Sequence, residues 1–235
     1  QPANPSASPN ASFSFSSEAG STFECRLDGS AFGPCTSPQT YTGLADGEHT
    51  FEVRAIDAAG NPDPTPATYT WTIDTVAPNT TITDQPNDPS NSPNASFDFN
   101  SNETGATFEC RLDDGPYGLC TSPQTYTGLA DGKHTFEVRA TDAAGNIDPT
   151  PATYTWTIDT VVPDTTITDG PANPSASPNA SFSFTSTKPG STFECQLDGG
   201  GFSACASPRT YTGLADGEHT FQVRAIDAMG TPDPT

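Results

Sequence analysis

The chain repeats itself at an interval of 85 residues, and this period limits its fold more than any other feature of the sequence. Two cysteines and one histidine mark each copy: Cys25, Cys35 and His49 return as Cys110, Cys120 and His134, and again as Cys195, Cys205 and His219. The 235 residues hold nearly three such periods. One period is long enough for a small domain, so the sequence predicts a tandem array that uses one fold three times.

Each copy has material for only a thin core, because hydrophobic residues make up 32% of the chain. The six cysteines recur as pairs with nine residues between the two members. An even number at a fixed spacing in small, loop-rich units predicts disulfides formed in an oxidising compartment. The rival interpretation is a metal site made by Cys25, Cys35 and His49. It offers three ligands and lacks the short Cys-x-x-Cys spacing of structural zinc sites.

The segment around the first cysteine of each copy has the pattern of a β-hairpin. Phe23, Cys25 and Leu27 share one face of an alternating strand, and Asp28-Gly29 follows as a turn signal. Counting back from that turn places Cys25 nearly opposite Cys35. We therefore predict one disulfide per copy, closing a single hairpin.

Alternation of apolar and polar residues continues through the rest of each copy. The clearest strand runs from His49 to Ala55, and a final strand brings Trp71, whose alternation with threonines favours a place in the core. About seven short strands, no helix and a turn signal roughly every 8–12 residues predict an all-β fold. The expected architecture is a tandem array of Ig-like Greek-key β-sandwiches.

The repeat frame divides the chain into three predicted domains. Residues 1–75 lack the opening strand, residues 76–160 form a complete domain, and residues 161–235 lack the last strand. Inserting 19 residues between the last and first positions would restore unbroken repetition. We therefore expect either a window of a longer array or a polymer subunit whose end domains are completed by strands of neighbouring copies. The expected partners are copies of the chain itself, arranged end to end.

The formal net charge is −21, and lysine occurs only at positions 133 and 188. Binding to nucleic acid or to an anionic membrane surface requires a basic patch, so the charge argues against both classes of partner, and we expect no nucleic acid to bind. No run of about 18 apolar residues occurs, so this segment is expected to insert into no membrane. Two interpretations of the charge stay open: a soluble, mutually repelling surface, or the binding of divalent cations.

The stretch Gly47-x-His49-x-Phe51-x-Val53-x-Ala55-x-Asp57-Ala-Ala-Gly60-Asn61 resembles the bacterial Ig-like repeats of large surface and secreted proteins. It is also similar to the fibronectin type III and PKD groups, and its cysteines match one subgroup of the bacterial repeats. The resemblance covers essentially the whole chain. It implies an extracellular or cell-surface stalk or spacer of an adhesin or surface fibre, often made rigid by calcium. His49 stands where the family usually has tyrosine.

The loops that follow the clearest strand are candidates for calcium, because calcium prefers carboxylate and carbonyl oxygens. The candidate ligands are Asp57, Asn61, Asp63, Asp142, Asn146, Asp148, Asp227 and Asp233. Asp74 or Asp84 would add ligands near a domain boundary. The alternative, which we favour, is that Asp and Asn simply form turns here, and Thr231 removes one ligand from the third copy. No cofactor is required, and calcium is the one candidate ion.

No arrangement of catalytic residues stands out, and the histidines are predicted to be core or corner residues because each lacks the partners that catalysis requires. Five Asn-x-Ser/Thr triplets are acceptors of N-linked sugar in an organism that glycosylates secreted proteins: Asn10, Asn79, Asn94, Asn102 and Asn179. The predicted function is a structural repeat segment of an extracellular fibre, filament or adhesin stalk, with strand exchange as a variant. The alternative is a carbohydrate- or ligand-binding module of a secreted or surface protein, which needs an exposed row of aromatic residues. We expect no enzymatic activity.

Overall fold

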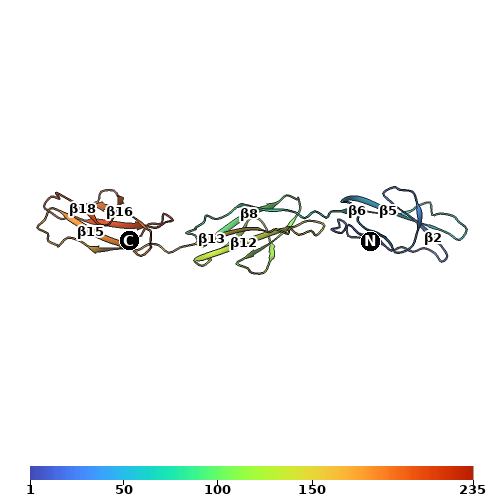
Figure 1. The fold of residues 1–235 in the computed structure, drawn as a ribbon, viewed down its shortest axis with the longest axis horizontal. Coiled ribbons are helices and arrows are strands. Elements are labelled where there is room, and N and C mark those ends of the chain that lie inside the picture. The colour runs from blue at the N-terminus through green and yellow to red at the C-terminus, as the bar shows by residue number, and fades with distance from the viewer. Residues whose placement is uncertain (235) are drawn as a thin grey trace. The chain divides into compact units, whose positions relative to one another are not determined.

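The computed structural model describes residues 1–234, and within them the chain forms strands and no helix (Figure 1). The predicted all-β class, with three repeated sandwich-like units, is confirmed. The first repeat contains β1 (Ala11–Phe13), β2 (Thr22–Leu27), β3 (Gly33–Cys35), β4 (Gln39–Tyr41), β5 (Gly47–Ile56) and β6 (Ala67–Ile73). The second contains β7 (Thr80–Asp84), β8 (Ala95–Ser101), β9 (Thr107–Leu112), β10 (Gly118–Cys120), β11 (Gln124–Tyr126), β12 (Gly132–Thr141) and β13 (Ala152–Ile158). The third contains β14 (Thr165–Asp169), β15 (Ala180–Ser186), β16 (Thr192–Leu197), β17 (Ser203–Cys205), β18 (Arg209–Tyr211) and β19 (Phe221–Ile226).

Each repeat is built from two sheets. In the second repeat one sheet has the strand order β10-β9-β12-β13 and the other β11-β8-β7. The first repeat has the sheet β3-β2-β5-β6 and the pair β1-β4, and the third has the sheets β17-β16-β19 and β14-β15-β18. No helix in residues 1–234 is long and apolar enough to cross a membrane.

Packing also divides the chain into two compact units whose limits differ from those of the repeats. The first comprises Gln1–Gln85, Phe97–Gln124 and Thr135–Tyr154, and the second comprises Pro86–Ser96, Thr125–His134 and Thr155–Thr235. The two charged clusters described below lie one in each unit.

The core of each repeat is a small aromatic stack. Phe13 lies on Phe51 with ring centroids 4.1 Å apart, and the rings of Phe13 and Trp71 are 5.1 Å apart. Trp71 and Trp156 are each only 1% exposed, so both tryptophans belong to cores. Because every repeat buries so few large side chains, the hydrophobic contribution to its stability is correspondingly small.

A disulfide joins neighbouring strands in every repeat, as the cysteine spacing predicts. Cys25 binds Cys35, Cys110 binds Cys120 and Cys195 binds Cys205, with Cα–Cα distances of 5.7, 5.8 and 5.8 Å.

The expectation that the two cysteines of a pair lie nearly opposite each other needs a correction. In the register of β2 and β3, Phe23 faces Cys35 and Cys25 faces Gly33. The cysteines are therefore diagonal neighbours on one face of the hairpin, a spacing that a disulfide spans without distortion of the backbone.

Candidate functional site

The first carboxylates predicted as calcium ligands serve their own turns. Asp57 Oδ1 accepts hydrogen bonds from the backbone N–H groups of Ala59 and Asn61 at 2.9 and 2.8 Å, and its Oδ2 accepts one from Asn61 Nδ2 at 2.9 Å. The side-chain hydrogen bond from Asn61 contributes most to lowering the pKa of Asp57. This is the turn chemistry that the sequence offered as the alternative to calcium.

Further along these loops, the aspartates of the second and third repeats bind the segment that opens their own repeat. Asp148 Oδ2 accepts a hydrogen bond from Thr80 N at 2.8 Å, and Asp233 Oδ2 accepts one from Thr165 N at 2.7 Å. Burial acts to raise the pKa of Asp148, but the hydrogen bonds from Thr80 and Thr150 outweigh it and lower the pKa. Asp63 Oδ1 accepts hydrogen bonds from the backbone N–H and the hydroxyl of Thr65, two residues away in its own loop. These carboxylates hold the fold together and do not converge on one point.

Two of the candidate calcium ligands, Asp142 and Asp74, join a group of three carboxylates. Asp74 follows β6, Glu103 lies in the turn between β8 and β9, and Asp142 follows β12. One carboxylate oxygen from each lies within 4.8 Å of the other two, and all three side chains are half-buried. We call this group the triple-carboxylate cluster. Asp74 and Asp142 were sequence candidates, whereas Glu103 was not.

Asn146 holds two members of the triple-carboxylate cluster in place. Its Nδ2 donates hydrogen bonds to the backbone carbonyl oxygen of Asp74 and to Asp142 Oδ2, both at 2.7 Å. Burial, followed by repulsion from Asp74 and Asp142, raises the pKa of Glu103. Burial also acts to raise the pKa of Asp142, but hydrogen bonds from Asn146 and from the turn backbone lower it. The cluster therefore gathers negative charge that a cation would stabilise.

The same three positions in the next repeat show a cation in place. The residues 85 positions after Asp74, Glu103 and Asp142 are Asp159, Lys188 and Asp227. Lys188 Nζ lies 2.9 Å from both carboxylate oxygens of Asp159 and 3.0 Å from Asp227 Oδ2. We call this group the lysine cluster. Burial acts to lower the pKa of Lys188, but its hydrogen bonds to the two aspartates raise it, so the ammonium stays charged.

The lysine cluster and the triple-carboxylate cluster occupy equivalent positions in two repeats. The ammonium of Lys188 stands in for a cation bound between the same two aspartates, and glutamate replaces it in the other unit. Three carboxylates offer up to six oxygens, the ligand type and number that calcium takes. Asp74, Glu103 and Asp142 would hold such an ion. The sequence signal for this site was the exchange of Glu for Lys at one position of an otherwise repeated pattern.

The histidines use their ring nitrogens in structural contacts. His49 Nδ1 lies 2.8 Å from Asp28 Oδ2, Nε2 lies 2.8 Å from the carbonyl oxygen of Ala45, and the ring lies 5.5 Å from that of Trp71. The hydrogen bond to Ala45, and then that to Asp28, raises the pKa of His49. His219 repeats both contacts, with Asp198 and Ala215.

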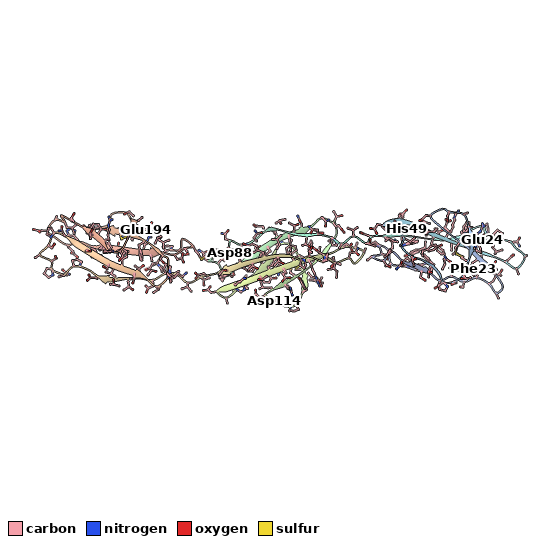
Figure 2. All side chains as sticks on the ribbon, in the orientation of Figure 1. Phe23, Glu24, His49, Asp88, Asp114 and Glu194 are labelled. Carbon is pink, nitrogen blue, oxygen red and sulfur yellow. A yellow bond between two sulfur atoms is a disulfide. The ribbon has the colours of Figure 1, made fainter. Side chains whose placement is uncertain are left out.

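A second recurring arrangement, which sequence reasoning missed, lies on the outer face of the sheets. Arg26 and Arg54 lie over the ring of Phe32 at 4.5 and 4.2 Å from its centroid. In the second repeat Arg111 and Arg139 lie in the same way over Tyr117, at 4.8 and 4.1 Å. The arginines also pair with glutamates across the strands, as Arg54 does with Glu24 at 2.6 Å. Figure 2 labels Glu24 of the first repeat and its counterpart Glu194 of the third. Cation–π contacts and ion pairs thus cover these aromatic rings.

The predicted sugar acceptors all lie at the surface. All five asparagines are exposed: Asn10, Asn79, Asn94, Asn102 and Asn179. In Asn10, Oδ1 accepts a hydrogen bond from Gly43 N at 3.1 Å, and Asn94 and Asn179 make the same contact in their own repeats. Their position is compatible with glycosylation, which stays a prediction.

No family model and no curated protein match this sequence. Among solved structures, the chain is similar to the fibronectin(III)-like modules of Clostridium thermocellum CbhA, at 14% identity over 67% of this chain and 89% of the other, with a TM-score of 0.43. It is also similar to a structure from a 1.5-MDa bacterial ice-binding adhesin, at 15% identity over 97% and 88%, with a TM-score of 0.43. A tetra-tandem repeat from the extending region of a large adhesion protein matches at 18% identity over 97% and 69%, with a TM-score of 0.29.

Proposed function

We propose that this chain is a structural repeat segment of an extracellular fibre, filament or adhesin stalk, and that it acts as a spacer without enzymatic activity. The observation that carries the proposal is that most of the recurring polar and charged side chains secure the fold of the repeats themselves. The aspartates cap turns, the histidines brace the core, and the arginines cover aromatic rings. Tandem copies of such a unit supply length and reach.

The disulfides support the extracellular location. Cystines persist in oxidising environments, and each one stabilises a repeat whose core is thin. The net charge of −21 supports the spacer role, because repulsion between like charges opposes the side-by-side association of neighbouring segments. Copies of the chain, arranged end to end, are the partners that this proposal implies.

A spacer must carry tension, so single-molecule stretching of the whole chain tests the function. We expect separate unfolding events, one for each folded repeat. Each disulfide closes a sequence separation of 10 residues across a Cα–Cα distance of about 6 Å. Because an extended chain spans roughly 3.3–3.6 Å per residue, reduction of the disulfide should increase the extension gained in each unfolding event by about 30 Å.

The matched control for stretching is a variant with Cys110→Ala and Cys120→Ala. In this variant reductant should leave the extension gained on unfolding of the second repeat unchanged. Extension without distinct unfolding events would refute the proposal that the chain is a spacer that carries tension. Saturable binding of a polysaccharide by the native chain would instead favour the carbohydrate-binding alternative. The burial of Trp71 and Trp156 argues against that alternative, because neither ring is available to stack on sugar.

The triple-carboxylate cluster adds an ionic contribution to this proposed function. We propose that Asp74, Glu103 and Asp142 bind calcium and so connect the end of β6 to two loops of the next repeat. In the lysine cluster, Lys188 supplies the positive charge permanently.

Melting measured in excess calcium and in chelator tests the ion site. The native chain should melt at a lower temperature in chelator, whereas a Glu103→Lys variant should melt at the same temperature in both. The reciprocal variant, Lys188→Glu, should gain a second calcium-dependent transition. Identical melting of the native chain in calcium and chelator would rule out the site while leaving the spacer proposal intact.

A further inference from the structure

A turn in the first repeat holds the residue at which the linker leaves that repeat. The turn comprises residues 43–46, between β4 and β5, and we call it the linker turn. Its last residue, Asp46, accepts hydrogen bonds at Oδ1 from Thr75 N at 3.1 Å and from Thr75 Oγ1 at 2.9 Å. Thr75 lies two residues after the end of β6, so it is the start of the linker. The linker therefore starts from a fixed point while the linker turn keeps its place.

Two contacts outside the linker turn keep it in place. Leu44 N donates a hydrogen bond to the carbonyl oxygen of Pro9, in the segment before β1, at 3.0 Å. His49 Nε2 lies 2.8 Å from the carbonyl oxygen of Ala45. The carbonyl group of Ala45 and the N–H of Asp46 belong to one planar peptide group. The contact with His49 therefore sets the orientation of Asp46, the residue that holds the linker.

Both ring nitrogens of His49 face oxygen atoms that accept hydrogen bonds. Nδ1 lies 2.8 Å from Asp28 Oδ2, and Nε2 faces the carbonyl oxygen of Ala45. Asp28 is itself fixed, because its Oδ1 accepts a hydrogen bond from Thr50 N at 2.8 Å. The ring lies 5.5 Å from that of Trp71, and the histidine side chain is 12% exposed. An imidazolium ring donates at both nitrogens, whereas a neutral ring donates at one, so the protonated form fits both contacts.

The neutral ring would give up the contact with the linker turn. The carboxylate of Asp28 is a stronger acceptor than a carbonyl oxygen, so the remaining ring hydrogen stays on Nδ1. The lone pair on Nε2 of His49 then faces the carbonyl oxygen of Ala45, and two acceptors repel each other. A further titratable group near Asp28 is the phenol of Tyr41 on β4. Burial raises the pKa of Tyr41, so this phenol stays neutral in the range in which histidine titrates.

We propose that His49 is a pH-sensitive latch on the linker. With both nitrogens protonated, the ring holds the linker turn and, through Asp46, the start of the linker at Thr75. When Nε2 loses its proton to solvent, the ring releases Ala45 and keeps its contact with Asp28. The peptide group that carries Asp46 is then free to turn, and the start of the linker is no longer held.

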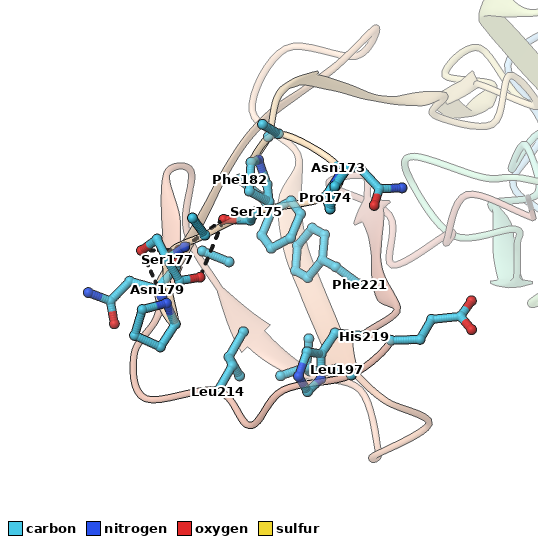
Figure 3. Close-up of a pocket in the computed structure, with 18 of the residues that line it drawn as sticks. Asn173, Pro174, Ser175, Ser177, Asn179, Phe182, Leu197, Leu214, His219 and Phe221 are labelled. Atoms are coloured by element: carbon cyan, nitrogen blue, oxygen red, sulfur yellow. Dashed lines mark hydrogen bonds between the residues drawn. The ribbon is translucent and has the colours of Figure 1, made fainter.

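The second repeat contains the same latch. His134 Nε2 lies 2.8 Å from the carbonyl oxygen of Ala130. The next residue, Asp131, accepts hydrogen bonds at Oδ1 from Thr160 N at 3.0 Å and from Thr160 Oγ1 at 2.8 Å. His219, labelled in Figure 3, keeps both ring contacts in the third repeat. The arrangement thus recurs with the repeat, and two linkers start from it.

The latch adds regulation by pH to the proposed spacer function, and its consequence rests on that function. The hydrogen bond to Ala45, and then that to Asp28, raises the pKa of His49, so the ring is protonated below the ordinary value of about 6.5 and loses its proton above it. The linkers are therefore held in acid and released in alkaline medium. A spacer with released linkers bends more freely, which changes its reach.

Nuclear magnetic resonance of the full 235-residue chain tests the latch. The ring-carbon shifts of the histidines give their titration midpoints from about pH 5 to about pH 9, on both sides of the ordinary pKa. Relaxation of the Cα–H bonds of Thr75 and Thr160 gives their order parameters. We expect the order parameter of Thr75 to fall from about 0.85 to below about 0.6 with the same midpoint as the His49 ring. That of Thr160 should follow His134.

Single substitutions provide matched controls within one molecule. In His49→Gln the order parameter of Thr75 should no longer change with pH, whereas Thr160 should still respond. His134→Gln should do the reverse, so a variant that disturbs its own repeat leaves the other latch readable. Asp46→Ala should release Thr75 at every pH, because it removes the carboxylate that holds this residue.

Three results would overturn the latch. The first is an unchanged order parameter of Thr75 while the His49 ring titrates. The second is a change whose midpoint differs from that of the ring, or that persists in His49→Gln. The third is an equal loss of order at the buried Trp71, which would mean that the whole repeat unfolds. Each of these results would leave the stretching test of the spacer untouched, so the two proposals fail separately.

Discussion

Removal of the disulfide in the middle repeat tests how the thin cores are stabilised. The change is Cys110→Ala together with Cys120→Ala, which opens a loop of sequence separation 10. Closing a loop of about 11 residues reduces the entropy of the unfolded chain by an amount worth about 2.8 kcal/mol at 25 °C. That is a large share of the stability of a small domain, typically about 5–15 kcal/mol. We therefore expect the middle repeat to lose about 2.8 kcal/mol, with an added packing cost because Cys110 is buried.

Trp156 provides a fluorescence signal for this repeat alone. The chain has two tryptophans, Trp71 in the first repeat and Trp156 in the second, and both are buried. In a Trp71→Phe background, urea unfolding followed by tryptophan emission reports on the middle repeat. With a slope of about 2 kcal/mol per molar urea, the midpoint should fall by about 1.4 M.

Reduction of the disulfide separates the two contributions to this loss. Reductant removes the cross-link and keeps both sulfur atoms, so reduced native chain should show the entropic loss alone. The alanine variant should show no response to reductant. A loss below about 1 kcal/mol after reduction would refute the reasoning, since the loop-closure term alone exceeds it. A much larger loss in the variant than in the reduced chain would assign the effect to packing of the sulfurs.

Three further predictions concern charged groups. The pKa of His49 in the folded chain is raised above its unfolded value of about 6.5. The contribution of His49 to stability is therefore complete below that value and is lost as the pH rises through the folded pKa. Urea unfolding of the first repeat between pH 6 and 9 should show this loss, and the His49→Gln variant should not show it. Asp148→Asn should destabilise the middle repeat by about 1–3 kcal/mol, because an amide cannot accept hydrogen bonds at both of its terminal atoms; unchanged unfolding would contradict the role of Asp148. Arg111→Gln or Glu137→Gln alone should destabilise more than the two together, since the third repeat has glutamine at both corresponding positions; additive losses in a double-mutant cycle would show that the pair is not coupled.

The strands and the disulfides could be predicted because both depend on local pattern. Alternation over five to seven residues places Phe51 and Val53 on the buried face, and the turn at Asp28-Gly29 limits which residues its flanking strands bring together. The diagonal placement of Cys25 and Cys35 was missed, because the register of the hairpin depends on the conformation of the loop between them.

The triple-carboxylate cluster could be predicted only in part. Asp74 and Asp142 were candidates from composition, but Glu103 comes from a turn that is distant in sequence from both. Only packing in three dimensions shows which acidic turn residues converge, and among residues 1–234 most of them do not. Comparison of the repeats supplied the missing evidence, because Lys188 occupies the position of Glu103 and contacts both aspartates.

The short span of the disulfides has a consequence for how an array of nearly identical units folds correctly. Each cysteine has a partner 10 residues away, while the nearest cysteine of the wrong repeat lies 75 residues away, from Cys35 to Cys110. Loop closure becomes less favourable as the 3/2 power of its length, so the correct pair meets about twenty times more often than the wrong one in an unfolded chain. The hairpin thus protects the fidelity of oxidation during synthesis, when neighbouring copies compete for the same partners.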